Sequence, residues 1–200
     1  RTQQLASSAF DTEVKEQIQN ERIAEVVKTV RKDLRPEVES SFKKINESDD
    51  FKSNIQLLEN HPSGQPFTKK DNEIVGGFGI NLGTYNDMFP NNKKTIGQSL
   101  SSSEEDAFIN KFKIKINEAI DDLNFNFTAN ERKALQLVLW NSGLGLFKGQ
   151  APQATTAIKD GNKEEFVKQI FSKKHGYNTK SPGSYKRKAI EHLIFKQGSL

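Results

Sequence analysis

The sequence predicts an α+β protein that is mostly helical, with a small glycine-rich β-hairpin sheet and a helical N-terminal extension. Apolar residues recur at helical spacing over most of the 200-residue chain. One stretch before its midpoint is instead rich in glycine and apolar residues, which is typical of turns and short strands. The first 48 residues contain no glycine and are rich in Glu, Lys and Gln, so their composition differs from that of the rest.

The N-terminal extension, residues 1–48, is predicted to contain two helices. Asp11 can cap a first helix that runs to about Leu34, and Pro36 is expected to end it. A second, shorter helix is marked by apolar residues at helical spacing, namely Val38, Phe42 and Ile45. Two interpretations stay open. The extension is either an attachment or assembly arm, or a pair of helices folded back onto the main domain.

The main domain, residues 49–200, is predicted to begin with a short amphipathic helix that ends just before Glu59. The segment that follows, from Asn60 to Gly64, contains Pro and Gly and cannot continue a helix. A carboxylate at a helix C-terminus lies next to carbonyl oxygens, which disfavour its charged form. We therefore expect a raised pKa for Glu59, as a general acid requires.

A glycine run from Ile74 to Gly83 is predicted to form most of the small sheet. Glycine within an apolar, strand-like pattern indicates close approach of backbone or ligand. A carboxylate at a helix end, followed by such a hairpin, can form the floor and wall of a sugar-binding cleft. The polar stretch from Asn86 to Gln98 is predicted to be a loop.

Helices are predicted for the C-terminal half of the chain. Ser102 with Glu105, and Thr128 with Glu131, have the spacing of capping boxes and are expected to begin two helices. The second of these is apolar enough to be central, and Gly143 is expected to end it. Shorter helices are expected at Ala154–Ile158, Glu164–Lys173 and Tyr185–Lys196.

Composition narrows the classes of function. The net charge of +4 predicts only mild attraction to polyanions, and we expect no nucleic-acid partner. Cysteine is absent, which excludes disulfides and thiolate chemistry. No apolar run approaches the roughly 18 residues of a membrane span, and no signal-peptide hydrophobic region is visible.

The sequence lacks the motifs of most classes of catalytic site. The histidines are scattered without paired-ligand spacing, and the glycine run lacks the residues of a phosphate-binding loop. No strand-turn elbow surrounds a serine. We therefore expect no metal and no cofactor. Paired carboxylates remain, because Glu59 together with Asp71 or Glu73 would bring two acids to one cleft, as glycoside hydrolysis commonly requires.

Three segments resemble one enzyme family. Leu57-Leu58-Glu59 followed by Gly77–Gly83 resembles the active-site segment of the phage-type lysozymes (glycoside hydrolase family 24) and of the pesticin-like muramidases. Lys133–Gly143 resembles the central helix of that family, and the segment 177–195 resembles its C-terminal turn and Arg-bearing helix. The segments occur in the family's order, and the resemblance covers about residues 51–198.

The resemblance implies a lysozyme-like fold and cleavage of the β-1,4 bond between N-acetylmuramic acid and N-acetylglucosamine in peptidoglycan. It places Glu59 as the general acid that protonates the leaving glycosidic oxygen. With this substrate, the expected glycan-contacting residues are Phe78, Asn81, Tyr85 and Asn141. The absence of a visible signal peptide fits a phage-coded enzyme, and the N-terminal extension favours a virion-associated one, with residues 1–48 contacting a virion or assembly partner. The alternative location is release into the periplasm or cell wall of a bacterial host.

The sequence departs from the family at two positions that support the attacking water. Val75 stands where the family has a threonine, and Asn81 stands where pesticin-like members have an aspartate. Valine cannot orient a water molecule, and a neutral amide is a poor base. Asp71 or Glu73 could take this role, or Glu59 could act nearly alone, as in single-glutamate lysozymes and lytic transglycosylases. The further alternatives are a glycan-binding or structural module without turnover, and an injected or bacteriocin-type toxin.

Overall fold

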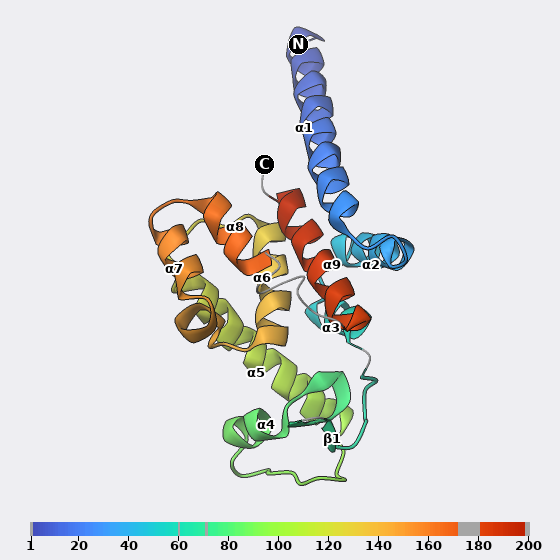
Figure 1. Ribbon diagram of the computed structural model, residues 1–200, viewed down its shortest axis with the longest axis vertical. Helices are drawn as coiled ribbons and strands as arrows, with labels where there is room; N and C mark the ends of the chain where they lie inside the picture. Colours follow the sequence, from blue (N-terminus) through green and yellow to red (C-terminus); the bar gives the residue numbers. More distant parts are fainter. Residues whose placement is uncertain (1, 60, 71, 172–180, 199–200) are drawn as a thin grey trace. The chain divides into compact units, whose positions relative to one another are not determined.

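The computed structural model describes residues 2–59, 61–70, 72–171 and 181–198, with the side chains of residues 2–12, 19 and 22 left out of the description. Helices dominate the described residues, and the sheet consists of two antiparallel strands (Figure 1). The α+β, mostly helical class predicted from the sequence is confirmed. The elements are α1 (Thr2–Thr29), α2 (Arg35–Asn46), α3 (Phe51–Leu58), β1 (Thr68–Lys70), β2 (Glu73–Val75), the 3-10 turn η1 (Gly77–Gly79), α4 (Leu82–Met88), α5 (Ser102–Asp121), α6 (Ala129–Ser142), the π-helical turn η2 (Leu146–Gln150), α7 (Pro152–Lys159), α8 (Lys163–Phe171) and α9 (Pro182–Gly198).

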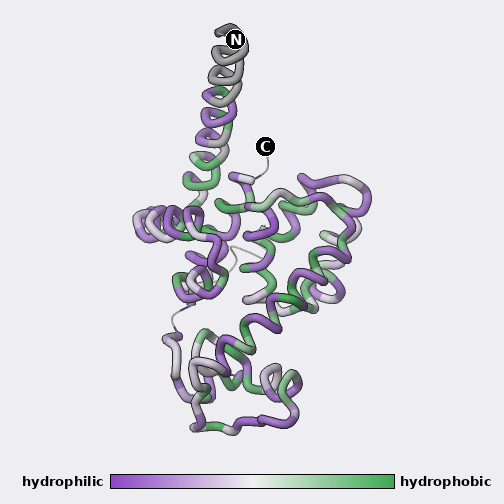
Figure 2. The backbone as a smooth tube through the Cα atoms, turned by 180° about the vertical axis from the view of Figure 1, so that it is seen from behind, coloured by the Kyte–Doolittle hydropathy of each residue, from purple (hydrophilic) through white to green (hydrophobic). Residues whose placement is uncertain are grey.

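The chain divides into two compact units, one of residues 47–118 and one of residues 1–46 together with 119–200. The first unit holds α3, the sheet, α4 and most of α5. Its core is built around stacked and tilted aromatic rings from α4, the loop after it and α5, which are Tyr85, Phe89, Phe108 and Phe112. Hydrophobic and hydrophilic residues alternate along α5 in Figure 2, as expected for a helix with one buried face.

Helix α6 is the centre of the second unit, as its apolar sequence predicts. Leu135, Leu137 and Leu139 are buried, and α9 packs along the helix (Figure 1). The predicted capping box is present, because the Thr128 hydroxyl accepts the Glu131 N–H and the Glu131 carboxylate accepts the Thr128 N–H. Gly143 follows the helix with a φ of 79°, a left-handed value that favours glycine.

The two N-terminal helices also pack against α9. Val38 and Ile45 of α2 are fully buried, and the Tyr185 hydroxyl of α9 donates to the carbonyl of Thr29 at 2.9 Å and accepts the N–H of Arg31 at 3.1 Å. Within this unit, both N-terminal helices therefore pack on α9. The division of the chain into an extension and a main domain stays a prediction. The role of residues 1–48 in attachment or assembly remains a prediction.

The end of the first helix differs from the prediction. α1 ends at Thr29, and Pro36 lies in the first turn of α2 instead of ending the helix before it. A proline is tolerated there because the first N–H groups of a helix have no intrahelical partner. The guanidinium of Arg35 donates to the carbonyl of Lys28, in the last turn of α1, and to that of Val30, which follows the helix.

The glycine run also differs from the prediction. Strand β2 ends at Val75, and Gly76–Gly79 forms a tight turn instead of continuing the hairpin. Asn81 then caps α4, since its side-chain oxygen accepts the N–H of Thr84, so helix replaces strand from Leu82 onward. The helix extends to Met88 and takes up the first residues of the loop predicted from Asn86 to Gln98.

Candidate active site

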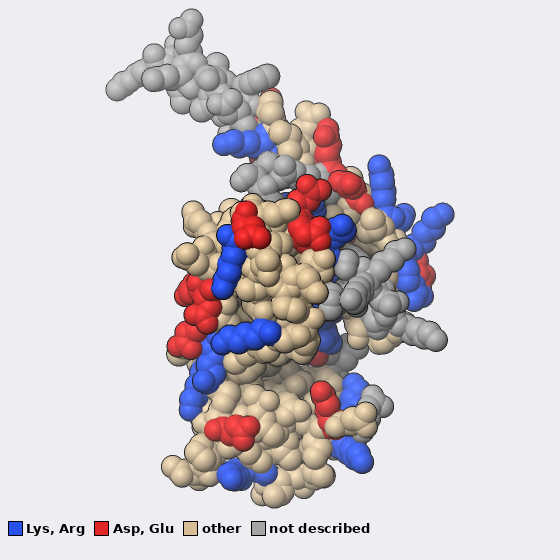
Figure 3. Space-filling model, turned by 60° about the vertical axis from the view of Figure 1, so that its left-hand side comes forward, with Lys and Arg blue, Asp and Glu red and all other residues tan. Residues whose placement is uncertain are grey.

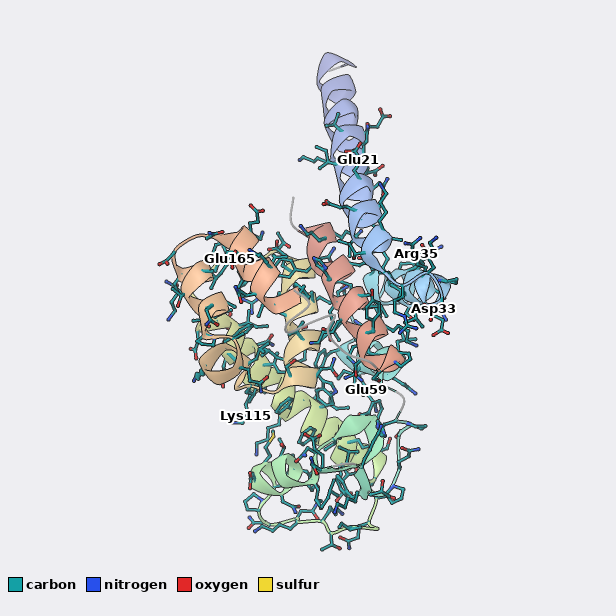
Figure 4. All side chains as sticks on the ribbon, viewed as in Figure 1. Glu21, Asp33, Arg35, Glu59, Lys115 and Glu165 are labelled. Carbon is teal, nitrogen blue, oxygen red and sulfur yellow. The ribbon has the colours of Figure 1, made fainter. Side chains whose placement is uncertain are left out.

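Glu59 lies at the C-terminal end of α3, as the sequence predicts (Figure 4). The helix is held in place by Phe51, Ile55 and Leu58, which are buried, and Asp50 caps its first turn by accepting the N–H of Ser53. The Glu59 N–H closes the last turn on the carbonyl of Ile55 at 2.8 Å, but its own backbone is extended. Glu59 is half-buried, and it follows directly on this anchored helix.

The turn after β2 brings backbone directly against this carboxyl group. Gly79 has a φ of 70°, and a Cβ atom added to it would lie 3.3 Å from Oε2 of Glu59 and 3.5 Å from its Cδ. The turn is closed by the N–H of Gly76, which donates to the carbonyl of Ile80 at 3.0 Å. The close approach expected of the glycine run is therefore found at Gly79, where a larger side chain would press on Glu59.

The two departures from the family pattern lie opposite each other across the same turn. Val75 and Asn81 form an isolated antiparallel bridge. Val75 presents an aliphatic side chain, and the amide oxygen of Asn81 is engaged in capping α4 at 3.1 Å from the N–H of Thr84. Neither residue supplies a base at this place.

The candidates for a second carboxylate are only partly described. Glu73 is an exposed residue of β2 and pairs in register with Lys70 of β1. Asp71 lies outside the described residues. The role of either acid as partner of Glu59 remains a prediction.

Two predicted glycan-contacting residues have buried rings. Phe78 is 1% exposed and has a left-handed φ of 57°, and Tyr85 is also 1% exposed. The Tyr85 hydroxyl accepts the side-chain amide of Asn92 at 3.2 Å, and burial raises the pKa of Tyr85. Both rings pack inside the unit, so a contact with glycan would have to come from the backbone around them or follow a rearrangement.

Asn141 belongs to the other compact unit, where it joins a polar network between α6 and α9. Its side-chain nitrogen donates to the buried carboxylate of Glu191 at 2.7 Å, and its oxygen accepts from the guanidinium of Arg187 at 2.5 Å. Lys188 adds an ion pair to Glu191 at 3.3 Å. The structure thus groups Asn141 with Glu191 and Arg187 of α9, while Glu59 lies near Gly79 in the other unit.

Sequence reasoning missed the role of one acid in the first unit. Glu105 was expected to close a capping box, yet it is fully buried and accepts hydrogen bonds from the turn after Glu59. The adjacent Glu104 closes the box instead, with Ser101 as the cap. Only the double acid at the start of α5 could have suggested that one of the two was available for another role.

The described residues give no sign of other site types. They contain no cluster of three or more His, Cys, Asp and Glu side chains that could hold a metal ion. Among the helices of the described part of the chain, none is long and apolar enough to cross a membrane. Lys and Arg side chains are interspersed with Asp and Glu on the face shown in Figure 3.

The sequence matches no protein-family model and no curated protein. The structure is similar to a solved structure, the muramidase domain of SpmX from Asticaccaulis excentricus, with a TM-score of 0.53. The two are 19% identical, and the match covers 74% of this chain and 95% of that domain. At this identity the similarity shows the fold alone, and it confirms the lysozyme-like fold predicted from the sequence.

Proposed function

We propose that this protein is a peptidoglycan muramidase that hydrolyses the β-1,4 bond between N-acetylmuramic acid and N-acetylglucosamine. The observation that carries the proposal is the position of Glu59 in a lysozyme-like fold. The residue follows the last turn of α3, and its carboxyl group lies next to Gly79. The similarity to a muramidase domain supports the same substrate class.

Glu59 is the general acid in this proposal. It donates its proton to the glycosidic oxygen as the bond from that oxygen to the anomeric carbon breaks. Water then adds to this carbon and gives up a proton to a base, which is Asp71 or Glu73 or, if Glu59 acts alone, the Glu59 carboxylate. Its position suits the task, because the residue ends an anchored helix, lies against the glycine turn at Gly79 and is only half-buried. We further propose that Asp71 or Glu73 assists the attacking water.

A second candidate function has its own support. Val75 and Asn81 lie opposite each other across the turn that carries Gly79, and neither supplies a base there. This favours either a mechanism in which Glu59 acts nearly alone or a glycan-binding module without turnover. The proposed setting is a phage-coded protein carried in the virion, with an injected or bacteriocin-type toxin as the alternative. Both settings rest on the family resemblance and on the helices of residues 1–46.

Mass spectrometry of fragments released from purified peptidoglycan tests these alternatives. Reducing-end muropeptides are expected from a hydrolase, and anhydro ends would identify a lytic transglycosylase. Release of neither, with the protein still pelleting on the wall material, would refute the muramidase proposal and favour the binding module. The second carboxylate is identified by assaying Asp71→Asn and Glu73→Gln separately. The acid that assists the water is the one whose replacement lowers the release of muropeptides.

A further inference from the structure

Glu105 is a buried acid to which the proposed chemistry assigns no part. It lies in the first turn of α5 and is 0% exposed. Its Oε1 accepts the backbone N–H of Gly64 at 2.8 Å, and its Oε2 accepts the hydroxyl of Ser63. Both donors belong to the turn that follows Glu59, so this carboxylate holds the chain close to the proposed general acid.

The same carboxylate also lies against the glycine turn that follows β2. A Cβ atom added to Gly77 would collide with Oε1 of Glu105, and it would lie 3.1 Å from the carbonyl of Pro62. Two backbone hydrogen bonds join these segments directly, from Gly77 to Gln65 at 3.2 Å and from Phe78 to His61 at 3.0 Å. Glu105 therefore sits where the turn after Glu59 meets the turn that carries Gly79.

The neighbouring acid shows that helix capping does not explain this burial. Glu104 accepts the N–H of Ser101 at 2.8 Å and forms an ion pair with Lys94 at 2.7 Å. The start of α5 is thus capped without Glu105. Burying a carboxylate is costly in free energy unless its oxygens accept hydrogen bonds. The hydrogen bonds that the structure shows for Glu105 come from Ser63 and Gly64, in the turn after Glu59.

We propose that Glu105 is a positioning residue for Glu59. The Glu105 carboxylate binds Ser63 and Gly64 and packs against Gly77. In this way Glu105 fixes the position of Gly79 relative to the Glu59 carboxyl group. The inference rests on the proposed muramidase function, because positioning is measured through turnover. Its consequence is that the geometry of the acid depends on a side chain that does not contact it.

The test compares Glu105→Ala, Glu105→Gln and Ser63→Ala with Glu104→Ala as the matched control. Each protein is assayed for kcat and KM on purified peptidoglycan, for the pH dependence of kcat, and for thermal stability. Glu104→Ala removes a cap and an ion pair from the adjacent position but touches neither turn. It therefore reports the effect of weakening the start of α5 and its contacts with Asn92 and Lys94 of the preceding loop.

We expect Glu105→Ala to lower kcat by about 100-fold with little change in KM, because a misplacement of about 1 Å costs this much. We expect a shifted basic limb of the pH profile, since the environment of Glu59 changes. Glu105→Gln should restore most of kcat, because its amide oxygen can accept from Gly64 and its amide nitrogen can donate to Ser63. Ser63→Ala should fall between these variants, and Glu104→Ala should lower stability but leave kcat unchanged.

A folded Glu105→Ala protein with the kcat and pH profile of the wild type would overturn the positioning role. If Glu105→Ala does not fold, Ser63→Ala is the deciding variant, and an unchanged kcat with an unchanged pH profile in Ser63→Ala would overturn the positioning role. An equal loss of kcat in Glu104→Ala would show that α5 stability explains the effect, which also overturns the inference. Failure of the muramidase proposal would be seen in the wild-type protein alone, as an absence of activity. Failure of the positioning role would be seen only when an active wild type is compared with its variants.

Discussion

Gly79 lies directly against the carboxyl group of Glu59, so that a single methyl group at this glycine would come within 3.3 Å of Oε2. The two residues come from different elements, the end of α3 and the turn after β2. Their proximity links the proposed acid to the glycine run. It makes the placement of Glu59 sensitive to changes in a turn that carries no chemistry of its own.

Gly79→Ala is expected to lower wall-degrading activity at least about tenfold, because the added methyl group displaces the Glu59 carboxyl. The left-handed backbone alone costs about 1 kcal/mol of stability when alanine replaces glycine. Gly97→Ala is the matched control, since Gly97 has a φ of 87° with nothing within 4 Å of an added Cβ. Equal activity losses in both variants would mean that backbone strain, and not contact with Glu59, is responsible.

Asn81→Asp is expected to raise activity without lowering stability. Aspartate caps a helix as well as asparagine does, so α4 should be retained, and the new carboxylate would stand beside the turn that holds Glu59. General-base assistance is typically worth about 100-fold or more, and a gain of at least about tenfold in kcat is expected. Val75→Thr, alone and combined with Asn81→Asp, completes the comparison. Unchanged kcat in the double variant would indicate that Glu59 does not rely on a base at these positions.

His192 of α9 is expected to make the protein acid-sensitive. Burial, with a smaller contribution from Lys196, lowers the pKa of His192 to about 3. Because the folded pKa lies below the unfolded value of about 6.5, the unfolded state binds more protons as the pH falls. Stability is therefore fully present above about pH 6.5 and decreases toward pH 3, by up to about 1.4 kcal/mol per pH unit.

His192→Leu should remove this part of the acid sensitivity. The measurement is the free energy of unfolding by urea at about pH 7 and about pH 5 for both proteins. The wild type should lose roughly 2 kcal/mol more than the variant between the two conditions. The other histidines are present in both proteins, so their contributions cancel. Parallel losses would show that His192 is not the group that titrates.

Truncation separates the two parts of the N-terminal helices. Deleting residues 1–22 should leave the melting temperature nearly unchanged, because Val14 and Ile18 are exposed. Deleting residues 1–46 should cost at least about 3 kcal/mol, since it removes the fully buried Val38 and Ile45 from their contact with the rest of the unit. Thermal melts of the three proteins check this. Equal stability of the longer deletion and the wild type would support a separate arm.

The position of Glu59 could be predicted because the information is local. Phe51, Ile55 and Leu58 recur at helical spacing, and the Pro and Gly that follow stop the helix. The capping box of Thr128 and Glu131 was predictable for the same reason. Both rest on residues within a few positions of each other.

The glycine turn and Glu105 were not predictable in this way. The left-handed backbone of Phe78 has no sequence signal, because a non-glycine residue adopts it only when its surroundings impose it. Asn81 fits a strand end and a helix cap equally well, and the cap prevails here. The hydrogen bond from Gly64 to Glu105 joins residues 41 positions apart, and local patterns do not report such long-range pairs.

The most direct test of the account is clearing of purified peptidoglycan by the wild type and by Glu59→Gln at equal concentrations. The variant replaces an acid with an amide of nearly the same shape, so stability should be unchanged while the transferable proton is lost. We expect the wild type to clear the suspension and the variant to leave it turbid, with matching thermal melts. Clearing by Glu59→Gln at the wild-type rate would contradict the assignment of Glu59 as the general acid.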